Sequence, residues 1–476
     1  MNFKCVKKLD KSYDRYVMLT SAVDFKLPDS FDETVEKGFK ELMKNEKSTP
    51  EKSKKFELNI LDGDKVKNFS LIYLGDAEKL DAKNIREAIY SGIKDITGKT
   101  LIIPLDEKAD NIDAVAEIVE NINYTYDKYL TEKKEKFLEA AYFTKKKLPE
   151  TIEGYELAKI SNIVKDLINE QAEVMTPKEL AHQTEKLGKK FGFEVEILDE
   201  KQAHKLGMDS YLSVARSAHH RPCVIVMRYK GNAKTEYTYG LVGKGLTYDT
   251  GGLSLKSSAG MMGMKEDMGG AATMIGAMCS IAAMKLDKNV TCVVAACENS
   301  IGPNAYRPGD IVKTMNGKTV EVTNTDAEGR LTLVDALTYI IREEKADEII
   351  DAATLTGAVI AALGENITGL FTNNNEMAQK FIAASENWHE YFWQMPMYDF
   401  FKKNLKSEVA DLQNTGAKYG GAVNAAKFLE QFVEDKKWIH LDIAGTVFAH
   451  TPTSYYKFGP TGEVFRTIYT YIKNNK

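Results

Sequence analysis

Apolar and polar positions alternate along the chain in short runs that favour strands and in longer periodic runs that favour helices. In the first third, the strand-like runs fall at 16–23, 56–61, 69–74 and 101–105. Helical patterns fall between and after them, at 31–43, 82–96 and 112–122. Such an alternation predicts an α/β domain. Lysine-rich segments at 133–136 and 145–147 precede Leu148-Pro149, and we therefore expect this domain to cover residues 1–150.

The remaining chain opens with a helical pattern and then returns to strand-like and helical runs. Residues 151–171 fit a connecting helix, and residues 172–476 fit a second, larger α/β domain. Two strand-to-helix connections stand out. In the first, residues 237–242 alternate like a strand, and residues 271–284 are apolar and small enough for a buried helix. In the second, residues 319–322 resemble a strand, and an apolar set follows at helical spacing: Leu331, Leu333, Val334 and Leu337. Open α/β sheets bind ligands at such connections.

The second connection is Asn324-Thr325-Asp326-Ala327-Glu328-Gly329-Arg330-Leu331. It brings two carboxylates and an arginine into one short loop. One interpretation is a metal site beside an anion receptor. The other is a capping loop, in which Asp326 accepts backbone N–H bonds and Arg330 pairs with Glu328. The loop alone does not decide between the two.

A glycine-rich segment around the first connection favours the metal interpretation. It consists of residues 242–256 and 264–272 and contains Lys244, Asp249, Lys256 and Asp267. Its glycines lie at positions 243, 245, 251, 252, 269 and 270. Glycine allows the backbone to turn with positive φ and to approach a bound group closely. The segment lacks the G-x-x-x-x-G-K-[ST] pattern of a phosphate-binding loop, which argues against a nucleotide site.

Together the two segments supply four carboxylates: Asp249, Asp267, Asp326 and Glu328. Four such charges would repel one another in a buried cleft without a cation, and two divalent ions would balance them. Oxygen ligands suit Mg²⁺, Mn²⁺ or Zn²⁺, and two ions roughly 3.5–4 Å apart can share and activate a bridging water. Lys244 could join these ligands only as a neutral amine, and its spacing alone also fits a salt-bridge partner.

These residues give the chain a clear resemblance to the leucyl aminopeptidase family, the cytosol aminopeptidases with two metal ions. The octapeptide 324–331 matches the family signature in full. Further matching blocks lie at 296–299, 304–310, 353–358, 409–412, 420–422 and 440–445. The resemblance covers about residues 172–476 and implies a metallopeptidase catalytic domain there, with a mixed sheet flanked by helices.

The resemblance also implies a role for individual residues. The implied metal ligands are Lys244, Asp249, Asp267, Asp326 and Glu328, with Asp249 and Glu328 contacting both ions. The implied catalytic residues that are not ligands are Lys256 and Arg330. The residues implied to line the pocket for the substrate's first residue, or to hold its backbone, are Met264, Asn324, Thr354, Leu355, Thr356 and Ala444.

The implied reaction is the release of amino-terminal, leucine-like residues from peptides by a hydroxide that bridges two divalent ions. Mn²⁺ and Zn²⁺ are expected first, and Mg²⁺ and Co²⁺ also suit the ligands. Lys256 would stabilise the oxyanion. None of the seven histidines falls in either segment, and the resemblance supplies another general base, a bicarbonate ion held at Arg330. It also implies a homohexamer. The methionine, alanine and leucine in the implied pocket suit apolar first residues.

Length and composition fit such an enzyme. With 476 residues and 43% hydrophobic content, the chain can bury the cores of two domains. A formal charge of −5 gives no electrostatic case for nucleic acid or an anionic membrane, and the lysine-rich segments fit a solvated face. The five cysteines form no C-x-x-C pair and are expected to be mostly buried free thiols. The start lacks an apolar h-region, and the chain lacks a span of 18 apolar residues, so we expect a cytoplasmic protein.

Two departures from the family and one rival function stay open at this point. Residues 169–173 read Asn-Glu-Gln-Ala-Glu where relatives commonly have an Asn-Glu-Pro-Ala-Asn type of sequence, and Val447 stands where some relatives have methionine at the pocket. The amino-terminal third shows no motif that we can match. A dipeptidase or an amidase on the same scaffold would share the chemistry. A binding module or an inactive scaffold would not explain the complete set of charged residues.

Overall fold

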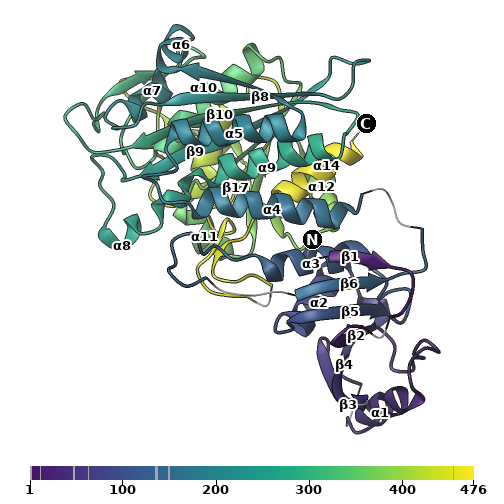
Figure 1. The fold of residues 1–476 in the computed structure, drawn as a ribbon. Coiled ribbons are helices and arrows are strands. Elements are labelled where there is room, and N and C mark those ends of the chain that lie inside the picture. Colours follow the sequence, from purple (N-terminus) through teal and green to yellow (C-terminus); the bar gives the residue numbers. More distant parts are fainter. Residues whose placement is uncertain are drawn as a thin grey trace. The chain divides into compact units, whose positions relative to one another are not determined.

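A computed structural model describes residues 3–10, 12–46, 49–62, 64–133, 138–147, 151–453 and 455–475 of the chain. It divides into two compact units (Figure 1). Unit 1 comprises Met1–Asn162, Glu386–His389 and Pro452–Tyr456; unit 2 comprises Ile163–Ser385, Glu390–Thr451 and Lys457–Lys476. The division falls within helix α4 (Glu153–Asn169). Leu148-Pro149, where the sequence pattern placed a boundary, and most of the lysine-rich segment 133–136 lie outside the described residues.

Unit 1 is built on a six-stranded sheet in the order β1-β6-β5-β2-β4-β3, parallel except for the β3–β4 pair. Its strands are β1 (Phe3–Val6), β2 (Arg15–Thr20), β3 (Lys54–Asp62), β4 (Lys65–Tyr73), β5 (Gly98–Pro104) and β6 (Leu138–Phe143). Its helices are α1 (Glu33–Lys44), η1 (Ala77–Lys79), α2 (Ala82–Ile93) and α3 (Ile112–Asn123). Asp32, Asp81 and Asn111 begin α1, α2 and α3 by accepting a backbone N–H, the usual role of an N-cap side chain. The α/β fold expected for this region is confirmed.

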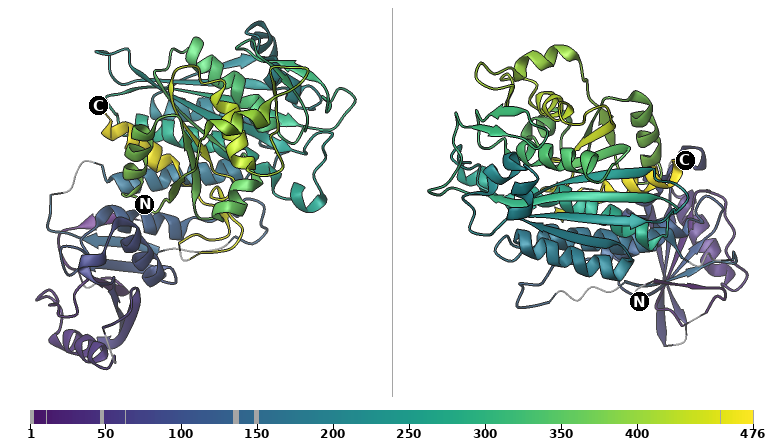
Figure 2. Two further views of the ribbon diagram at one scale, coloured as in Figure 1. Left: turned by 180° about the vertical axis from the view of Figure 1, so that it is seen from behind. Right: turned by 90° about the horizontal axis from the view of Figure 1, so that it is seen from above.

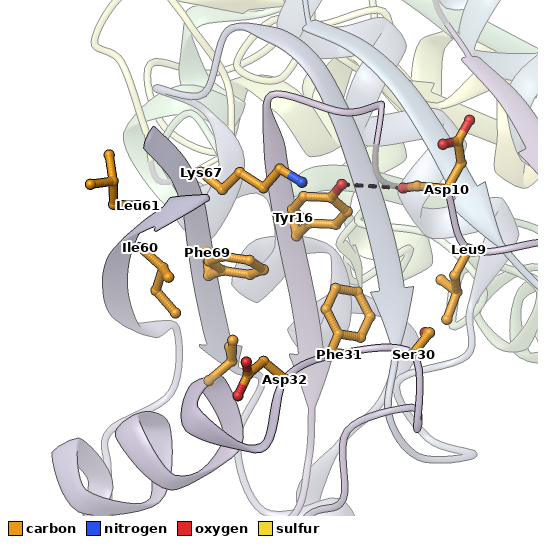
Figure 3. Close-up of a pocket in the computed structure, with 11 residues that line it drawn as sticks. Leu9, Asp10, Tyr16, Ser30, Phe31, Asp32, Ile60, Leu61, Lys67 and Phe69 are labelled. Atoms are coloured by element: carbon orange, nitrogen blue, oxygen red, sulfur yellow. Dashed lines mark hydrogen bonds between the residues drawn. The ribbon is translucent and has the colours of Figure 1, made fainter. Parts of the chain in front are cut away.

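A cavity of about 200 Å³ lies beside α1 in unit 1 (Figure 3). The rings of Tyr16 and Phe69 stack in its wall with centroids 5.2 Å apart, and Phe31 meets both rings edge-on. Lys67 and Asp10 add charged groups to the lining. None of the residues predicted to act in catalysis lines this cavity, so the predicted chemistry has to be sought in unit 2.

Two short pieces from the later part of the chain pack into unit 1. Tyr455 donates a hydrogen bond from its hydroxyl to Glu117 (2.6 Å), which also pairs with the buried Arg86 (2.6 Å). His389 contacts the Glu87 carboxylate through Nε2 at 3.0 Å, and Lys52 contacts the same carboxylate at 2.7 Å. These contacts explain why unit 1 includes residues from far along the sequence.

Because of the contact between Glu87 and His389, we expect the free energy of unfolding to fall as the pH is lowered into the acid range. The hydrogen bond from His389, against the opposing effect of burial and with help from Lys52, lowers the pKa of Glu87 to about 2. Because the folded pKa is depressed, the stabilisation is present above the unfolded pKa near 4.5 and is lost as the pH falls toward 2. A hydrogen bond of this kind contributes about 1 kcal/mol. We expect Glu87→Gln to lower the midpoint of thermal unfolding by about 2–4 °C at pH 7.

The deficit of Glu87→Gln should shrink in a pH series and disappear near pH 2. The matched control is Glu57→Gln, because Glu57 pairs with Arg15 and Lys55 on an exposed strand and such pairs contribute little. A deficit that stays constant from pH 7 to pH 2 would contradict the assignment of the effect to the carboxylate charge.

Unit 2 is built on a mixed eight-stranded sheet in the order β15-β14-β17-β13-β9-β10-β8-β7. Its strands are β7 (Glu194–Asp199), β8 (Cys223–Lys230), β9 (Thr238–Asp249), β10 (Asn289–Asn299), β13 (Glu348–Ala353), β14 (Thr368–Thr372), β15 (Phe392–Gln394) and β17 (Lys437–Asp442). The central strands β17, β13, β9 and β10 run parallel, and the β14–β17, β10–β8 and β8–β7 pairs are antiparallel. The carboxyl ends of the four parallel strands therefore lie at one edge of the sheet.

Helices cover both faces of this sheet (Figure 2), as expected from the resemblance. The helices are α5 (Pro177–Phe191), α6 (Glu200–Lys205), α7 (Asp209–Ala215), α8 (Ser258–Met261), η2 (Met264–Met268), α9 (Gly269–Ala283), α10 (Glu328–Arg342), α11 (Gly357–Leu363), α12 (Asn375–Ser385), η3 (Asp399–Leu405), α13 (Gly421–Glu430) and α14 (Phe465–Asn474). Small sheets are formed by β11 (Ile311–Lys313), β12 (Thr319–Glu321) and β16 (Leu412–Gln413), and by β18 (Phe448–Ala449) and β19 (Gly459–Pro460). No helix of the described residues is long and apolar enough to cross a membrane.

Strand β9 differs from the sequence-based expectation. The alternating pattern ended at residue 242, but β9 continues to Asp249, and Lys244 lies inside it. Of the six glycines in 242–256 and 264–272, only Gly251 and Gly252 have positive φ, and Gly263 between the two stretches has positive φ as well. Gly243 serves close packing instead, because a Cβ there would lie 2.8 Å from the Cα of Ala271 on α9. The glycines thus allow helix α9 to approach the strand, so that the site residues of both elements meet.

Candidate active site

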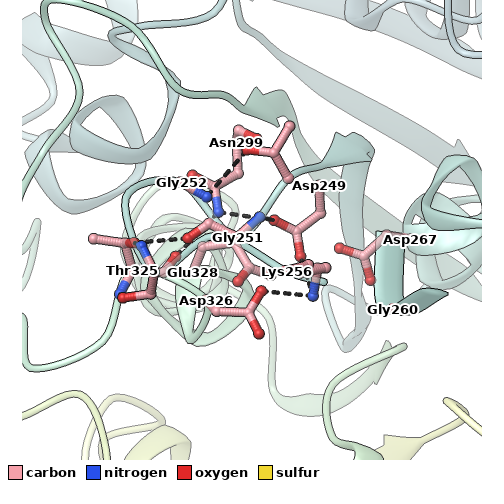
Figure 4. A network of polar contacts seen from close by, with 12 residues as sticks. Asp249, Gly251, Gly252, Lys256, Gly260, Asp267, Asn299, Thr325, Asp326 and Glu328 are labelled. Carbon is pink, nitrogen blue, oxygen red and sulfur yellow. Dashed lines mark hydrogen bonds and ion pairs between the residues drawn. The ribbon is translucent and has the colours of Figure 1, made fainter. Parts of the chain in front are cut away.

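The four carboxylates predicted to bind metal lie close together near the carboxyl end of β9 (Figure 4). Asp249 is the last residue of β9, Asp267 lies in η2 just before α9, and Asp326 and Glu328 lie where the octapeptide enters α10. Asp249, Asp326 and Glu328 each offer a carboxylate oxygen, and these oxygens lie within 4.8 Å of one another. Two segments that are distant in sequence, the end of β9 and the start of α10, thus present their carboxylates to one point.

Lys244 connects Asp267 to this group. Its Nζ lies 2.7 Å from Asp267 Oδ1, 3.0 Å from Glu328 Oε1 and 2.9 Å from the carbonyl oxygen of Thr354. The side chain is only 3% exposed. Burial lowers the pKa of Lys244, but the neighbouring carboxylates outweigh it and the net pKa is raised. Before any ion binds, Lys244 is therefore an ammonium, and a metal ion would have to displace its proton to gain the amine as a ligand.

Lys256 bridges the two carboxylates on the other side of the group. Its Nζ lies 2.9 Å from Asp249 Oδ2 and 2.6 Å from Asp326 Oδ1. Asp249 uses its other oxygen to accept hydrogen bonds from the Gly251 N–H and the Asn299 side chain, both at 2.8 Å. Burial lowers the pKa of Lys256 as well, but the carboxylates raise it overall. Two lysine ammonium groups therefore occupy the positions of counter-cations among four carboxylates.

The donors at this point fit divalent cations. Asp267 Oδ2 and Glu328 Oε2 are buried and have no hydrogen-bond partner, a costly arrangement for carboxylate oxygens unless a cation satisfies them. Burial raises the pKa of both groups, Asp267 strongly. Hard oxygen donors in a closed group are the ligand set that Mg²⁺, Mn²⁺ and Zn²⁺ accept.

Arg330 does not pair with Glu328, which binds Lys244 instead. Arg330 is 8% exposed; its guanidinium donates from Nη1 to the carbonyl oxygen of Asn414 (2.7 Å), and its Nε has no partner. Burial lowers its pKa to about 10. Helix α10 has no side-chain cap, since Ala327 is its N-cap residue. The capping interpretation of the octapeptide is therefore wrong, and a buried guanidinium with no carboxylate partner among the described residues suits a small anion.

The residues predicted to bind substrate lie around the same edge of the sheet. Thr354 donates from its hydroxyl to Asp267 Oδ1 (2.7 Å), and the backbone N–H groups of Leu355 and Ala444 point to Asp442. Thr356 begins α11 by accepting the Val359 N–H. The exposed Asn324 accepts the Asp326 N–H at 2.7 Å through its side chain, and the half-buried Met264 opens η2. Asn324 thus shapes the loop itself, in addition to any contact with a substrate.

Comparison with known proteins decides the family. The model of the cytosol aminopeptidase family, catalytic domain, matches residues 162–469, and the model of the N-terminal domain of the same family matches residues 18–133. The chain belongs to the cytosol aminopeptidase family. It is therefore a hydrolase with aminopeptidase activity, and its amino-terminal third, in which the sequence offered no motif, is the family's N-terminal domain.

Relatives of the family agree along the whole length. A probable cytosol aminopeptidase from Fusobacterium nucleatum subsp. nucleatum is 65% identical over 477 residues, covering 100% of both chains. One from Clostridium perfringens is 41% identical over 87% of this chain and 88% of the relative. Among solved structures, a tomato leucine aminopeptidase mutant is 30% identical with a TM-score of 0.85, covering 99% of this chain and 96% of that chain. A bottromycin maturation enzyme in complex with Mn is 28% identical with a TM-score of 0.85, over 97% and 99% of the two chains.

Three residues of this aminopeptidase hold the site together and had no role in the sequence-based prediction. Asn299 binds Asp249, and Asp442 binds the loops after β13 and β17. Asn414 accepts the Thr323 N–H (2.8 Å), donates to the Asn324 carbonyl (2.7 Å) and accepts Arg330 through its own carbonyl. Asn299 and Asp442 lie in blocks that resemble the family, which was a usable signal. Asn414 lies just beyond such a block, and nothing in its spacing indicated a role.

Proposed function

We propose that this aminopeptidase releases amino-terminal, preferably apolar residues from peptides with the help of two divalent ions. The proposed ligands are Lys244, Asp249, Asp267, Asp326 and Glu328. The observation that supports the proposal is the group of four carboxylates, three of them buried, in which two oxygens have no hydrogen-bond partner and two lysines form the ion pairs. When bound, the two ions supply a hydroxide nucleophile at neutral pH and polarise the peptide carbonyl.

The choice of ion follows from the donors and from one relative. Mn²⁺ and Zn²⁺ are proposed first, and the Mn complex of the bottromycin maturation enzyme, a structural relative, supports Mn²⁺. Mg²⁺ and Co²⁺ also fit a group of four carboxylates and one amine. The proposed cytoplasmic location rests on the family, whose relatives are called cytosol aminopeptidases.

The chain's own residues account for the remaining steps. Lys256, whose ammonium contacts Asp249 and Asp326, would stabilise the oxyanion that forms as the carbonyl is attacked. Arg330 holds a small anion, proposed to be bicarbonate, that accepts a proton from the nucleophile and passes it to the leaving amine. Met264, Thr354, Leu355 and Ala444 line the position of the first residue, with Asn324 and Thr356 beside them.

Self-association into a homohexamer is proposed from the family resemblance. Unit 2 supports it with several large side chains that are exposed in the single chain, among them Trp393, Tyr398 and Phe400, because clustered exposed aromatic residues commonly mark subunit contacts. Light scattering during gel filtration tests this directly. A mass near 53.3 kDa at working concentration would contradict it.

The proposed function is tested by a panel of substrates after chelation. The purified protein is freed of metal and assayed with leucine amide, alanine amide, glutamate amide and N-acetyl-leucine amide, before and after addition of each ion. We expect no activity without metal, recovery with Mn²⁺ or Zn²⁺, fastest cleavage of leucine amide and no cleavage of the acetylated substrate. Equal cleavage of the free and acetylated amides would contradict an aminopeptidase and favour an amidase. Full activity after exhaustive chelation would contradict the metal proposal.

Replacement of Arg330 tests the proposed anion. We expect the wild type to gain activity when bicarbonate is added to depleted buffer, and Arg330→Ala to lose this response. Because a positioned base contributes about 10²–10⁴ in rate and buffer can replace part of it, the variant should fall by roughly tenfold to a hundredfold. Arg342→Ala is the matched control, since Arg342 lies at the exposed end of the same helix and pairs with Glu434. A bicarbonate response that Arg330→Ala retains would show that the anion binds elsewhere.

A further inference from the structure

Asp442 joins the two loops that the substrate-binding proposal depends on. It is the last residue of β17 and is 1% exposed. Its Oδ1 accepts the N–H groups of Leu355 (3.2 Å), Thr356 (3.4 Å) and Ala444 (3.3 Å), and its Oδ2 accepts the Thr356 hydroxyl (2.6 Å). Since β13 and β17 run parallel with Ala353 opposite Asp442, one carboxylate fixes the chain where both strands end.

The direction of these hydrogen bonds sets the direction of two carbonyl groups. The peptide unit between Thr354 and Leu355 is trans and planar, so its N–H and C=O point in opposite directions. The N–H points to Asp442, and the C=O accepts Lys244 Nζ at 2.9 Å. One rigid unit therefore connects Asp442 to a proposed metal ligand. The next unit also gives its N–H to Asp442, which turns the Leu355 carbonyl away from that carboxylate.

We propose that Asp442 is a positioning residue of this aminopeptidase: by holding two successive peptide N–H groups, it aims the Thr354 carbonyl at Lys244 and the Leu355 carbonyl at the backbone of the bound peptide. The inference rests on the proposed function, because it assigns Lys244 to the metal and Leu355 to the substrate. Asp442 itself contacts neither, and acts through the backbone of the loop after β13.

A competing explanation is that Asp442 acts through its charge, since it is one of the carboxylates close enough to influence the Arg330 guanidinium. Asparagine separates the two explanations. In Asp442→Asn, the amide oxygen can accept the same three N–H groups, and the amide nitrogen can donate to the Thr356 hydroxyl oxygen, which has acceptor capacity. The substitution preserves the hydrogen bonds and removes the charge. Asp442→Ala removes both.

The experiment compares wild type, Asp442→Asn and Asp442→Ala in two measurements. The first is the binding of Mn²⁺ to chelated protein by titration calorimetry, and the second is kcat and KM for a leucine-initiated dipeptide and for leucine amide. Residues that orient ligands typically change metal affinity or activity by about 10–100-fold. We expect Asp442→Ala to weaken Mn²⁺ binding and kcat/KM by about that amount with both substrates, because the scissile amide nitrogen of each carries an N–H that the Leu355 carbonyl can accept. Asp442→Asn should recover at least about tenfold of the loss.

Three further variants keep the test decisive. Asp347→Ala is the matched control, because Asp347 also accepts a strand N–H, that of Thr238 at 2.9 Å, but at the opposite end of β9. Thr356→Val keeps the Asp442 carboxylate and removes the bond to its Oδ2, together with the Val359 N–H bond that begins α11, and it serves if Asp442→Ala does not fold. It should weaken Mn²⁺ binding measurably, and Thr356→Ser, which keeps both bonds, should restore it. If Asp442→Asn loses as much Mn²⁺ affinity and kcat/KM as Asp442→Ala, the role of Asp442 belongs to its charge and the positioning proposal is wrong. Unchanged Mn²⁺ binding and kinetics in Asp442→Ala or in Thr356→Val would overturn the proposal. If the wild-type protein keeps its activity without metal, the proposed function is wrong instead.

Discussion

Glu328→Gln is expected to abolish most of the activity, with a fall in kcat/KM of roughly 10³-fold or more. Glu328 is buried, lies within ligand distance of Asp249 and Asp326, and has one oxygen without a partner. A bound divalent ion supplies several kcal/mol of stabilisation to the transition state, and each 1.36 kcal/mol corresponds to about tenfold in rate. The amide keeps the size of the side chain but removes one of the charges that the ions would balance. Mn²⁺ binding should therefore weaken together with the rate.

The measurement pairs steady-state kinetics at saturating Mn²⁺ with titration calorimetry on chelated protein. Glu343→Gln is the matched control, because Glu343 is the exposed C-cap residue of the same helix. Lys244 also pairs with Glu328, so thermal unfolding of the chelated variant has to be compared with that of wild type. A chelated Glu328→Gln protein that is folded, binds Mn²⁺ with unchanged affinity and retains the wild-type rate would remove Glu328 from the proposed ligands.

The chemistry of the site was the part of this structure most accessible from sequence. Asp326, Glu328 and Arg330 lie within one octapeptide, so their proximity follows from covalent geometry and needs no knowledge of the fold. The meeting of this octapeptide with Asp249 followed from the tendency of strand-to-helix loops to share one edge of a sheet. The structure places the loop after β12, a strand of a small separate sheet, and the carboxylates still converge because α10 packs on the main sheet beside β9 and β10.

Contacts between residues that lie far apart in the chain could not be predicted from the sequence. The bond from Lys244 to the Thr354 carbonyl and the bond from the Leu355 N–H to Asp442 depend on the register of β9, β13 and β17, which no local pattern encodes. Strand β6 was not predicted, for a related reason. Its Leu-Glu-Ala-Ala-Tyr-Phe sequence contains two alanines, a residue type that favours strands only weakly. Pairing with β1 and β5 on its two sides stabilises the strand instead. The affiliation of Glu386–His389 with unit 1 likewise exists only in three dimensions.

Lys256→Met is expected to separate catalysis from metal binding. Lys256 Nζ contacts Asp249 and Asp326, at 2.9 and 2.6 Å, so in the absence of an ion it occupies the charge-balancing position that the ion would take. Removing it leaves the carboxylates intact and less neutralised, and Mn²⁺ affinity should therefore stay the same or rise. The rate should fall by about 10²–10³-fold, the usual cost of losing one group that stabilises an oxyanion. The loss should appear in kcat, because the negative charge on the substrate develops only in the transition state.

The pattern across variants makes this prediction specific. Glu328→Gln should lose Mn²⁺ affinity and rate together, whereas Lys256→Met should lose rate alone, and Lys256→Arg should recover part of the rate because it keeps the charge with a different geometry. Lys313→Met, on the exposed strand β11, is the matched control. If Lys256→Met instead lowers Mn²⁺ affinity in proportion to its rate, Lys256 organises the ligands and the oxyanion is stabilised by another group. If it raises KM with kcat unchanged, Lys256 binds the ground state of the substrate and its assignment as a catalytic residue is wrong.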